Sequence, residues 1–220
     1  MRHRSRGGGL TEPRLVSSGR RDRRRVALSF DDGPSRSTPE VLEILDAYSA
    51  RATFFVIGSW VERLPEIVRD AATRGHEIAN HTWSHADADR IRQLATLRDE
   101  VGRTSVVIEA TVAAAPRLLR PPYGSDPGRY ARVAAACGLH ATVLWSVQTF
   151  DWQDPEDAAS IVEQVAAEAE PGAIVLFHDG HRLKNDDRPR RATVAALPRA
   201  LEWLRSNGYE MTTVSELLGS

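Results

Sequence analysis

The sequence predicts an α/β domain in the form of a distorted, incomplete (β/α) barrel of about seven parallel strands. Short apolar runs alternate with amphipathic segments from Val26 onward, and this alternation predicts parallel strands joined by crossover helices. Several amphipathic segments end at a glycine, which is typical of a helix C-terminus. Residues 26–220 are few for a closed eight-stranded barrel, which typically takes ~250 residues. A doubly wound open sheet is the alternative architecture.

The individual elements follow from these two kinds of pattern. The apolar runs predict strands at residues 26–30, 52–57, 77–80, 117–119, 140–146, 173–177 and 209–213. The amphipathic segments predict helices at residues 38–49, 60–74, 90–113, 128–136, 155–170 and 190–206. Gly75, Gly138 and Gly208 follow the second, fourth and sixth helix and serve as their C-caps. No internal repeat interrupts this order.

The charge divides the chain into two parts. Residues 1–25 hold nine arginines against Glu12 and Asp22, a formal charge of +7, which leaves −8 for residues 26–220. Because the basic part contains Gly7–Gly9 and no apolar periodicity, we expect a disordered tail over 1–25 and one folded domain over 26–220. An arm that binds nucleic acid or a membrane surface is the alternative interpretation of the arginines.

Composition excludes several classes of protein. With 27% charged residues and no apolar run near the ~18 residues of a membrane-spanning helix, the chain is not expected to enter a membrane. Its only cysteine, Cys137, excludes an intramolecular disulfide framework and a cysteine-based zinc site, so that any metal must be held by His and carboxylate. No apolar signal segment follows the arginines, which predicts a cytoplasmic protein; a start upstream would allow secretion or a cell-wall location.

Several residues that could act as metal ligands, acids or bases come directly after the predicted strands. Because the carboxyl ends of parallel strands meet at one edge of a sheet or barrel, these residues are expected to converge on one site. They are Asp31 and Asp32 after the first strand, His81 and His85 after the third, Arg120 after the fourth, Asp151 after the fifth and His178 after the sixth.

Two histidines and two carboxylates among them suggest a metal site. His81 and His85 are four residues apart, so one helical turn brings both rings within reach of one cation. Two adjacent carboxylates are costly without a cation, and Asp32 is the candidate third ligand. Since side chains alternate along an extended chain, Asp31 points elsewhere, toward a metal-bound water, as a general base. Turn chemistry is the alternative for Asp32-Gly33-Pro34, but it does not explain Asp31.

Five short motifs, taken together, resemble the polysaccharide deacetylase family, the NodB-homology domain of carbohydrate esterases. They are Ser29–Pro34, His81–His85, Arg120–Tyr123, Asp151–Trp152 and Leu176–His178, in the order and spacing of the family. The likeness covers residues 26–218. The fourth motif departs from the family pattern because Gln148 stands where an Asp is usual, which affects the hydrogen bonding of that loop rather than the metal site.

The resemblance implies a distorted (β/α) barrel and a set of roles for these residues. One divalent metal, usually zinc, with Co²⁺ or another transition metal as alternative, is held by an Asp and two His, here Asp32, His81 and His85. Asp31 deprotonates the metal-bound water, which attacks an N-acetyl carbonyl. The remaining roles are oxyanion stabilisation by the backbone N–H of Tyr123, protonation of the departing amine by His178, orientation of that imidazole by Asp151, and support of the carboxylates by Arg120, with Pro122, Trp152 and Leu176 lining the substrate pocket.

The resemblance also implies the substrate class. Expected substrates are N-acetylglucosamine saccharides of the peptidoglycan or chitin type, with release of acetate; an amidase of a small intracellular N-acyl metabolite and an O-acetyl xylan esterase are alternatives. Trp60, Trp83 and Trp152 are expected to rim an open groove for sugar rings, or, for Trp60 and Trp83, to belong to the core. We expect a monomer with neither nucleic-acid nor membrane partners.

Two further classes fit part of this pattern. Fe(II) oxygenases also use two histidines and one carboxylate, but they do not require Asp31 and His178 as an acid–base pair. A binding module that has lost catalysis would keep the fold, yet every predicted catalytic group is present in this chain.

Overall fold

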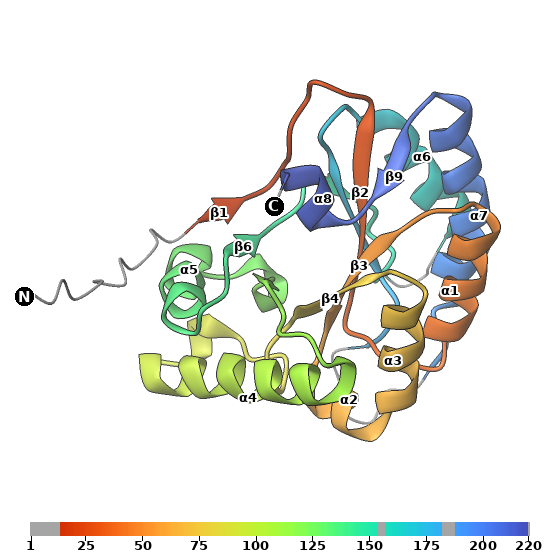
Figure 1. Cartoon of the computed structure of the whole chain (residues 1–220). Coiled ribbons are helices and arrows are strands. Elements are labelled where there is room, and N and C mark those ends of the chain that lie inside the picture. Colours follow the sequence, from red (N-terminus) through yellow and green to blue (C-terminus); the bar gives the residue numbers. More distant parts are fainter. Residues whose placement is uncertain (1–13, 154–156, 182–187, 220) are drawn as a thin grey trace, which may run out of the picture.

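The protein is described by a computed structural model that covers residues 14–153, 157–181 and 188–219 (Figure 1). Nine strands form one sheet in the order β1-β6-β5-β4-β3-β2-β8-β7, and β9 pairs with β2 outside this path. All ladders between these strands are parallel. The strands are β1 (Leu15–Val16), β2 (Arg25–Asp31), β3 (Ala52–Val56), β4 (Glu77–Asn80), β5 (Leu118–Leu119), β6 (Ala141–Val143), β7 (Val147–Gln148), β8 (Ile174–His178) and β9 (Glu210–Thr212).

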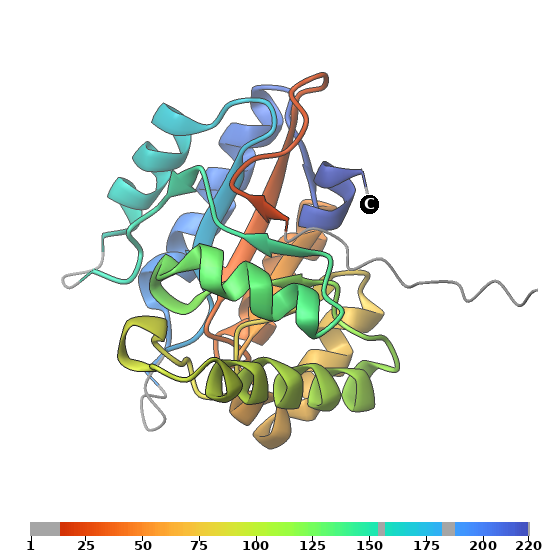
Figure 2. The same cartoon turned by 90° about the vertical axis from the view of Figure 1, so that its left-hand side faces the viewer.

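Helices cover the outside of the curled sheet, except for the last one, which packs Val214 and Leu217 against its inner face. They are α1 (Thr38–Ala47), α2 (Gly58–Arg63), α3 (Pro65–Thr73), α4 (Leu94–Val112), α5 (Pro127–Ala136), α6 (Ala158–Glu168), α7 (Arg191–Ser206) and α8 (Val214–Leu218), with 3₁₀ turns at Ala88–Arg90 and Pro122–Gly124. α7 packs against α1 and α6 on one side, and α4 packs against α2, α3 and α5 on the other (Figures 1 and 2). Within the described ranges no ladder joins β1 to β7, so the barrel is incomplete, as predicted.

Proline and short pairings explain where the elements differ from the sequence prediction. The helix predicted at 60–74 is two helices, because Pro65 cannot donate to the preceding turn and instead begins α3. The strand predicted at 140–146 contains only the shorter β6, and β7, which lies beyond that range and pairs with a different neighbour, was not predicted. The last short helix, α8, was not predicted; its N-terminus is a capping box formed by Thr213 and Glu216.

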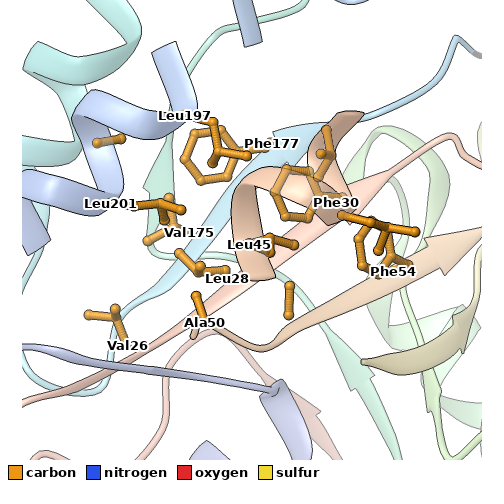
Figure 3. Packing of buried hydrophobic residues seen from close by; sticks show 14 of the residues in the cluster. Val26, Leu28, Phe30, Leu45, Ala50, Phe54, Val175, Phe177, Leu197 and Leu201 are labelled. Atoms are coloured by element: carbon orange, nitrogen blue, oxygen red, sulfur yellow. The ribbon is translucent and has the colours of Figure 1, made fainter. Parts of the chain in front are cut away.

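The main core lies between the sheet and the helices α1 and α7. Val26, Leu28 and Phe30 of β2 alternate along the strand and face this side, where they are fully buried (Figure 3). The Phe30 ring stacks on Phe54 with centroids 5.1 Å apart and on Phe177 with centroids 5.4 Å apart. Burial of these rings fixes the register of β2, β3 and β8, because a slip by one residue would turn each strand over.

The opposite face of the same strands lines the barrel interior and leads to the site. Ala27 belongs to a second, interior cluster, and the next residues on its side of β2 are Ser29 and Asp31. On β8 the interior side ends at His178, which is paired directly with Asp31. Because apolar residues of β2 and β8 face the core, the alternate residues face the barrel interior, and the polar ones among them lie at the carboxyl ends of these strands.

The domain begins earlier than Val26, which corrects the predicted boundary of the tail. The amide of Thr142 donates to Arg14 O at 2.8 Å and that of Leu144 to Val16 O at 2.7 Å, so β1 extends the sheet at β6. Gly19 N donates to Gly172 O at 2.8 Å. Two apolar residues are too few to give a periodicity, which is why residues 14–25 were assigned to a disordered tail. Residues 1–13 lie outside the described part of the chain.

None of the described helices combines the length and the apolar character needed to cross a membrane.

Candidate metal and catalytic site

Three predicted ligands meet at the carboxyl end of the barrel. One ligand atom from each of Asp32, His81 and His85 lies within 4.8 Å of the others, and all three side chains are buried. Asp32 Oδ1 is 3.2 Å from His85 Nε2 and 3.5 Å from His81 Nε2. The site is thus formed by one residue after β2 and two residues after β4.

The protonation of these groups fits a divalent cation. His81 Nδ1 donates to the carbonyl oxygen of Arg120 at 2.9 Å, which leaves its Nε2 to face Asp32. Burial lowers the pKa of His85 to about 4, although the negative charge of Asp32 acts to raise it. The His85 ring is therefore neutral at neutral pH. Burial alone would raise the pKa of Asp32, but the imidazoles of His81, His85 and His178 outweigh it, and the net shift is downward.

A buried oxygen atom without a hydrogen-bond partner also supports a cation at this site. Among the described residues, Asp32 Oδ1 has no hydrogen-bond partner although it is buried. Imidazole nitrogens that present lone pairs to a carboxylate oxygen repel it unless a cation lies between them. Two His and one carboxylate also leave a coordination position for water, as in catalytic zinc sites.

The loop that carries the two histidines is held by side chains that the sequence analysis did not single out. Thr82 and His85 have φ angles of 66° and 58°, in the left-handed region that residues with a Cβ rarely adopt. The Asn80 carboxamide accepts from Thr82 N at 2.9 Å and donates to Val101 O at 2.9 Å. Thr82 Oγ1 accepts from Ala86 N at 3.0 Å. Asn80, at the end of β4, therefore ties the strained loop to α4.

Two glycines allow the loops after β2 and β8 to interlock. A Cβ at Gly180 would lie 2.1 Å from the carbonyl oxygen of Asp32, and one at Gly33 would lie 2.3 Å from Asp179 Oδ2. Asp179 is fully buried and accepts from the Thr38 hydroxyl at 2.5 Å; burial raises its pKa to about 7. Asp179 was not predicted as a functional residue; the sequence signal for it is the Asp-Gly pair at Asp179-Gly180, which repeats the Asp32-Gly33 pair after another strand.

The predicted base, Asp31, forms an ion pair with a buried arginine. Arg120 Nη1 donates to Asp31 Oδ1 at 2.7 Å and to Ser29 Oγ at 2.9 Å, and its guanidinium lies 4.1 Å from the centre of the Phe55 ring. Burial lowers the pKa of Arg120 while Asp31 opposes that shift. The other oxygen of Asp31 lies 3.8 Å from His81 Nε2. One carboxylate oxygen is thus fixed by Arg120, and the other is directed toward the ligand cluster.

On β8, the predicted acid His178 is paired with Asp151. Asp151 Oδ1 lies 2.7 Å from His178 Nδ1, and Asp151 Oδ2 accepts from His178 N at 2.7 Å and from Thr193 Oγ1 at 2.8 Å. Burial alone would lower the pKa of His178, but the Asp151 carboxylate, with Asp32 and Asp31, raises it above the ordinary value. Burial acts to raise the pKa of Asp151, and His178 outweighs it, so that pKa is lowered. Thr193 of α7 is a second neighbour that sequence reasoning missed.

The residues predicted to line the pocket or the groove differ in how exposed they are. Tyr123 has a φ of 60°, is 52% exposed, and its ring meets His85 edge-on with centroids 4.6 Å apart. Trp152 is exposed, whereas Pro122 and Leu176 are buried. Trp83 is stacked by Arg103 at 4.0 Å, so it packs between α2 and α4. The ring of the half-buried Trp60 is covered by Arg63 at 5.0 Å.

The predicted residues therefore fall into two linked groups. The first contains Asp31, Asp32, His81, His85 and Arg120, which contact one another directly. The second is the His178–Asp151 pair, joined to the first by the pairing of His178 with Asp31 on adjacent strands. Gln148, the departure in the fourth motif, accepts from Trp145 Nε1 at 3.4 Å.

A sequence model of the polysaccharide deacetylase family matches residues 18–142, more than half of the chain. The chain belongs to the polysaccharide deacetylase family. This family member is 41% identical over 201 residues to a chitooligosaccharide deacetylase of Bradyrhizobium sp. (strain ANU 289), with 88% of this chain and 90% of the relative covered. It is 42% identical over 200 residues to a peptidoglycan-N-acetylglucosamine deacetylase of Bacillus cereus (strain ATCC 14579), with 88% and 87% covered.

Solved structures show the same architecture. The crystal structure of a peptidoglycan N-acetylglucosamine deacetylase superimposes with a TM-score of 0.84 at 30% identity, over 94% of this chain and 93% of that chain. The predicted barrel-like fold of the family member is thereby confirmed.

Proposed function

We propose that this protein is a metal-dependent hydrolase that removes N-acetyl groups from N-acetylglucosamine-containing saccharides and releases acetate. The observation that carries the proposal is the buried Asp32–His81–His85 cluster beside an arginine-held Asp31 and the His178–Asp151 pair. The two curated relatives, a chitooligosaccharide deacetylase and a peptidoglycan-N-acetylglucosamine deacetylase, support the substrate class at almost equal identity.

Asp32, His81 and His85 would hold the metal, for which zinc is our first choice and Co²⁺ the alternative. When bound, such an ion supplies a Lewis acid that brings the pKa of a coordinated water toward ~7 and stabilises negative charge on the substrate carbonyl. The neutral state of His85 and the ionised state of Asp32 suit this role, because metal ligands must be deprotonated.

Asp31 would take the proton from the water that attacks the acetyl carbonyl. Arg120 occupies one oxygen of Asp31 at 2.7 Å and leaves the oxygen nearer His81 for that proton. Arg120 thus acts as a positioning residue for the base. The backbone N–H of Tyr123 would donate to the oxyanion that develops on the carbonyl oxygen, a contribution of about 3 kcal/mol where such donors have been removed from enzymes.

His178 would then protonate the amine nitrogen as the C–N bond breaks and acetate forms. Its Nδ1 is engaged by Asp151, which leaves Nε2 to deliver the proton. Asp151 raises the pKa of His178 and so keeps the imidazole protonated at neutral pH. Pro122, Trp152 and Leu176 would border the space for the acetyl group.

The decisive experiment measures acetate release by metal-reconstituted protein from soluble N-acetylglucosamine oligomers, peptidoglycan, acetylxylan and small N-acetyl amides. We expect turnover of the N-acetylglucosamine oligomers, loss of turnover with a chelator, and recovery with Zn²⁺ or Co²⁺. Turnover of only the small amides or of acetylxylan would reject the proposed substrate. Full activity in metal-free protein would reject the mechanism.

A further inference from the structure

The loop between β7 and α6 presents two aromatic rings to solvent beside the His178–Asp151 pair. Phe150 is 39% exposed and Trp152 is 49% exposed, while the intervening Asp151 and the preceding Thr149 are buried. The two ring centroids are 6.5 Å apart and the planes are inclined by 50°. The backbone therefore alternates between buried polar anchors and exposed rings along this loop.

This loop is firmly attached, so the rings are presented at fixed positions. Thr149 Oγ1 donates to Leu176 O at 2.7 Å, and Asp151 accepts from His178 and Thr193. A turn closes when Gln153 N donates to Phe150 O at 3.0 Å. The same contacts that orient His178 thus determine where Phe150 and Trp152 lie.

The conformation of Phe150 is unfavourable for the residue that occupies it. Its φ is 55°, a left-handed conformation that favours glycine and asparagine and disfavours a bulky aromatic side chain. A ring that remains 39% exposed also contributes less to folding than a buried one. Folding therefore does not explain a phenylalanine here, and an outlier of this kind next to catalytic groups suggests a role in binding.

We propose that Phe150, together with Trp152, forms a platform for a sugar ring adjoining the residue whose N-acetyl group is removed. This inference rests on the proposed function. The C–H faces of a pyranose bury apolar area against an aromatic ring without requiring a charge, which matches a neutral saccharide chain. Because the platform shares its loop with Asp151, a ring bound there lies next to the proton-delivering His178, as the neighbour of a reacting sugar must.

The test compares binding and turnover of an N-acetylglucosamine pentamer and dimer by the metal-loaded wild type and the Phe150→Asn variant. Asparagine suits the left-handed backbone, so the variant is expected to keep the loop conformation and the thermal midpoint. The pentamer should show a Kd and a KM raised about 3- to 10-fold, with a smaller change for the dimer. Phe150→Tyr should retain the pentamer affinity. Val106→Asn, which replaces a 68% exposed apolar residue on α4, is the matched control and should leave Kd and KM unchanged for both oligomers.

The outcomes separate this inference from the proposed function. If the wild type and Phe150→Asn turn over the pentamer with equal Kd and KM, the platform proposal is wrong and the proposed deacetylase activity stands. Pentamer binding that weakens in Phe150→Asn, without acetate release by the wild type, would support the platform and reject the activity. Absence of both pentamer binding and turnover in the wild type would overturn both. Equal weakening by Val106→Asn would also overturn the platform.

Discussion

Replacing Asp151 by asparagine should disable His178 without removing it. Asp151 Oδ2 accepts two donors, His178 N and Thr193 Oγ1, so the amide oxygen of an asparagine is expected to take that position. Its NH₂ group would then face His178 Nδ1, now 2.7 Å from a carboxylate oxygen. A donor at that position requires Nδ1 to be an acceptor, and the protonated imidazole is disfavoured twice: it loses the anion and it meets a second donor.

The size and sign of the effect follow from this arrangement. In the wild type Asp151 raises the pKa of His178 against the opposing effect of burial, so the acid remains protonated to higher pH. Without Asp151 the pKa falls, and the high-pH limb of the kcat profile should move to lower pH. Loss of general acid catalysis costs about two to four orders of magnitude in kcat, or about 3–5 kcal/mol in activation free energy.

The assay is kcat against pH for acetate release from an N-acetylglucosamine oligomer, with metal content measured on the same samples. Metal content should match the wild type, because Asp151 has no contact with the proposed ligands among the described residues. Thr193→Val is the matched control: it removes one hydrogen bond to Asp151 and keeps the charge, and we expect less than about a tenfold loss of kcat. A kcat for Asp151→Asn within tenfold of wild type, with the high-pH limb unmoved, would refute this reasoning.

The remaining predictions concern the ligands, the loop contacts and the first strand. Asp31→Asn should retain metal and lose about two to four orders of magnitude in kcat, whereas His81→Ala should lose metal; loss of metal from Asp31→Asn would show that the roles are misassigned. Gly180→Ala should lower the free energy of unfolding by ~1–3 kcal/mol and weaken metal binding, because its Cβ would lie 2.1 Å from Asp32 O. The control Gly102→Ala, which meets no atom within 4 Å inside α4, should stabilise by ~1 kcal/mol in the same denaturant titration. Deletion of residues 1–22 should lower the thermal midpoint by several degrees since it removes β1, and a midpoint equal to that of a 1–13 deletion would contradict the role of β1.

Much of the fold was predictable because local patterns and burial agree. The strand at 77–80 has the bounds that were predicted, and Asp31, Arg120 and His178 stand at strand ends as expected. The pattern failed at two of the elements that are too short to show a period. β1 and β7 have two residues each, and they are stabilised by pairing with distant segments rather than by their own sequence.

The clustering of Asp32, His81 and His85 was predictable from the sequence, but the residues that support this cluster were not. Adjacent carboxylates and paired histidines are visible as motifs, because their chemistry requires those residue types. Asn80, Thr193 and Asp179 act through contacts with residues many positions away, at Val101, Asp151 and Thr38, and such contacts leave no local pattern. The left-handed backbone at Phe150 is equally invisible in sequence, since that residue type argues against it.

The pairing of β2 with β8 has a consequence for how this barrel can vary. Asp31 and His178 stand on one hydrogen-bonded ladder, so their spacing is set by peptide geometry rather than by the flanking loops. β7, one edge of the barrel's seam, pairs directly with β8, and the loop that follows β7 carries Asp151. Loops that carry none of Asp31, Asp151 and His178 can therefore lengthen, shorten or shift to suit different glycan chains while the spacing between the proposed base and acid stays constant.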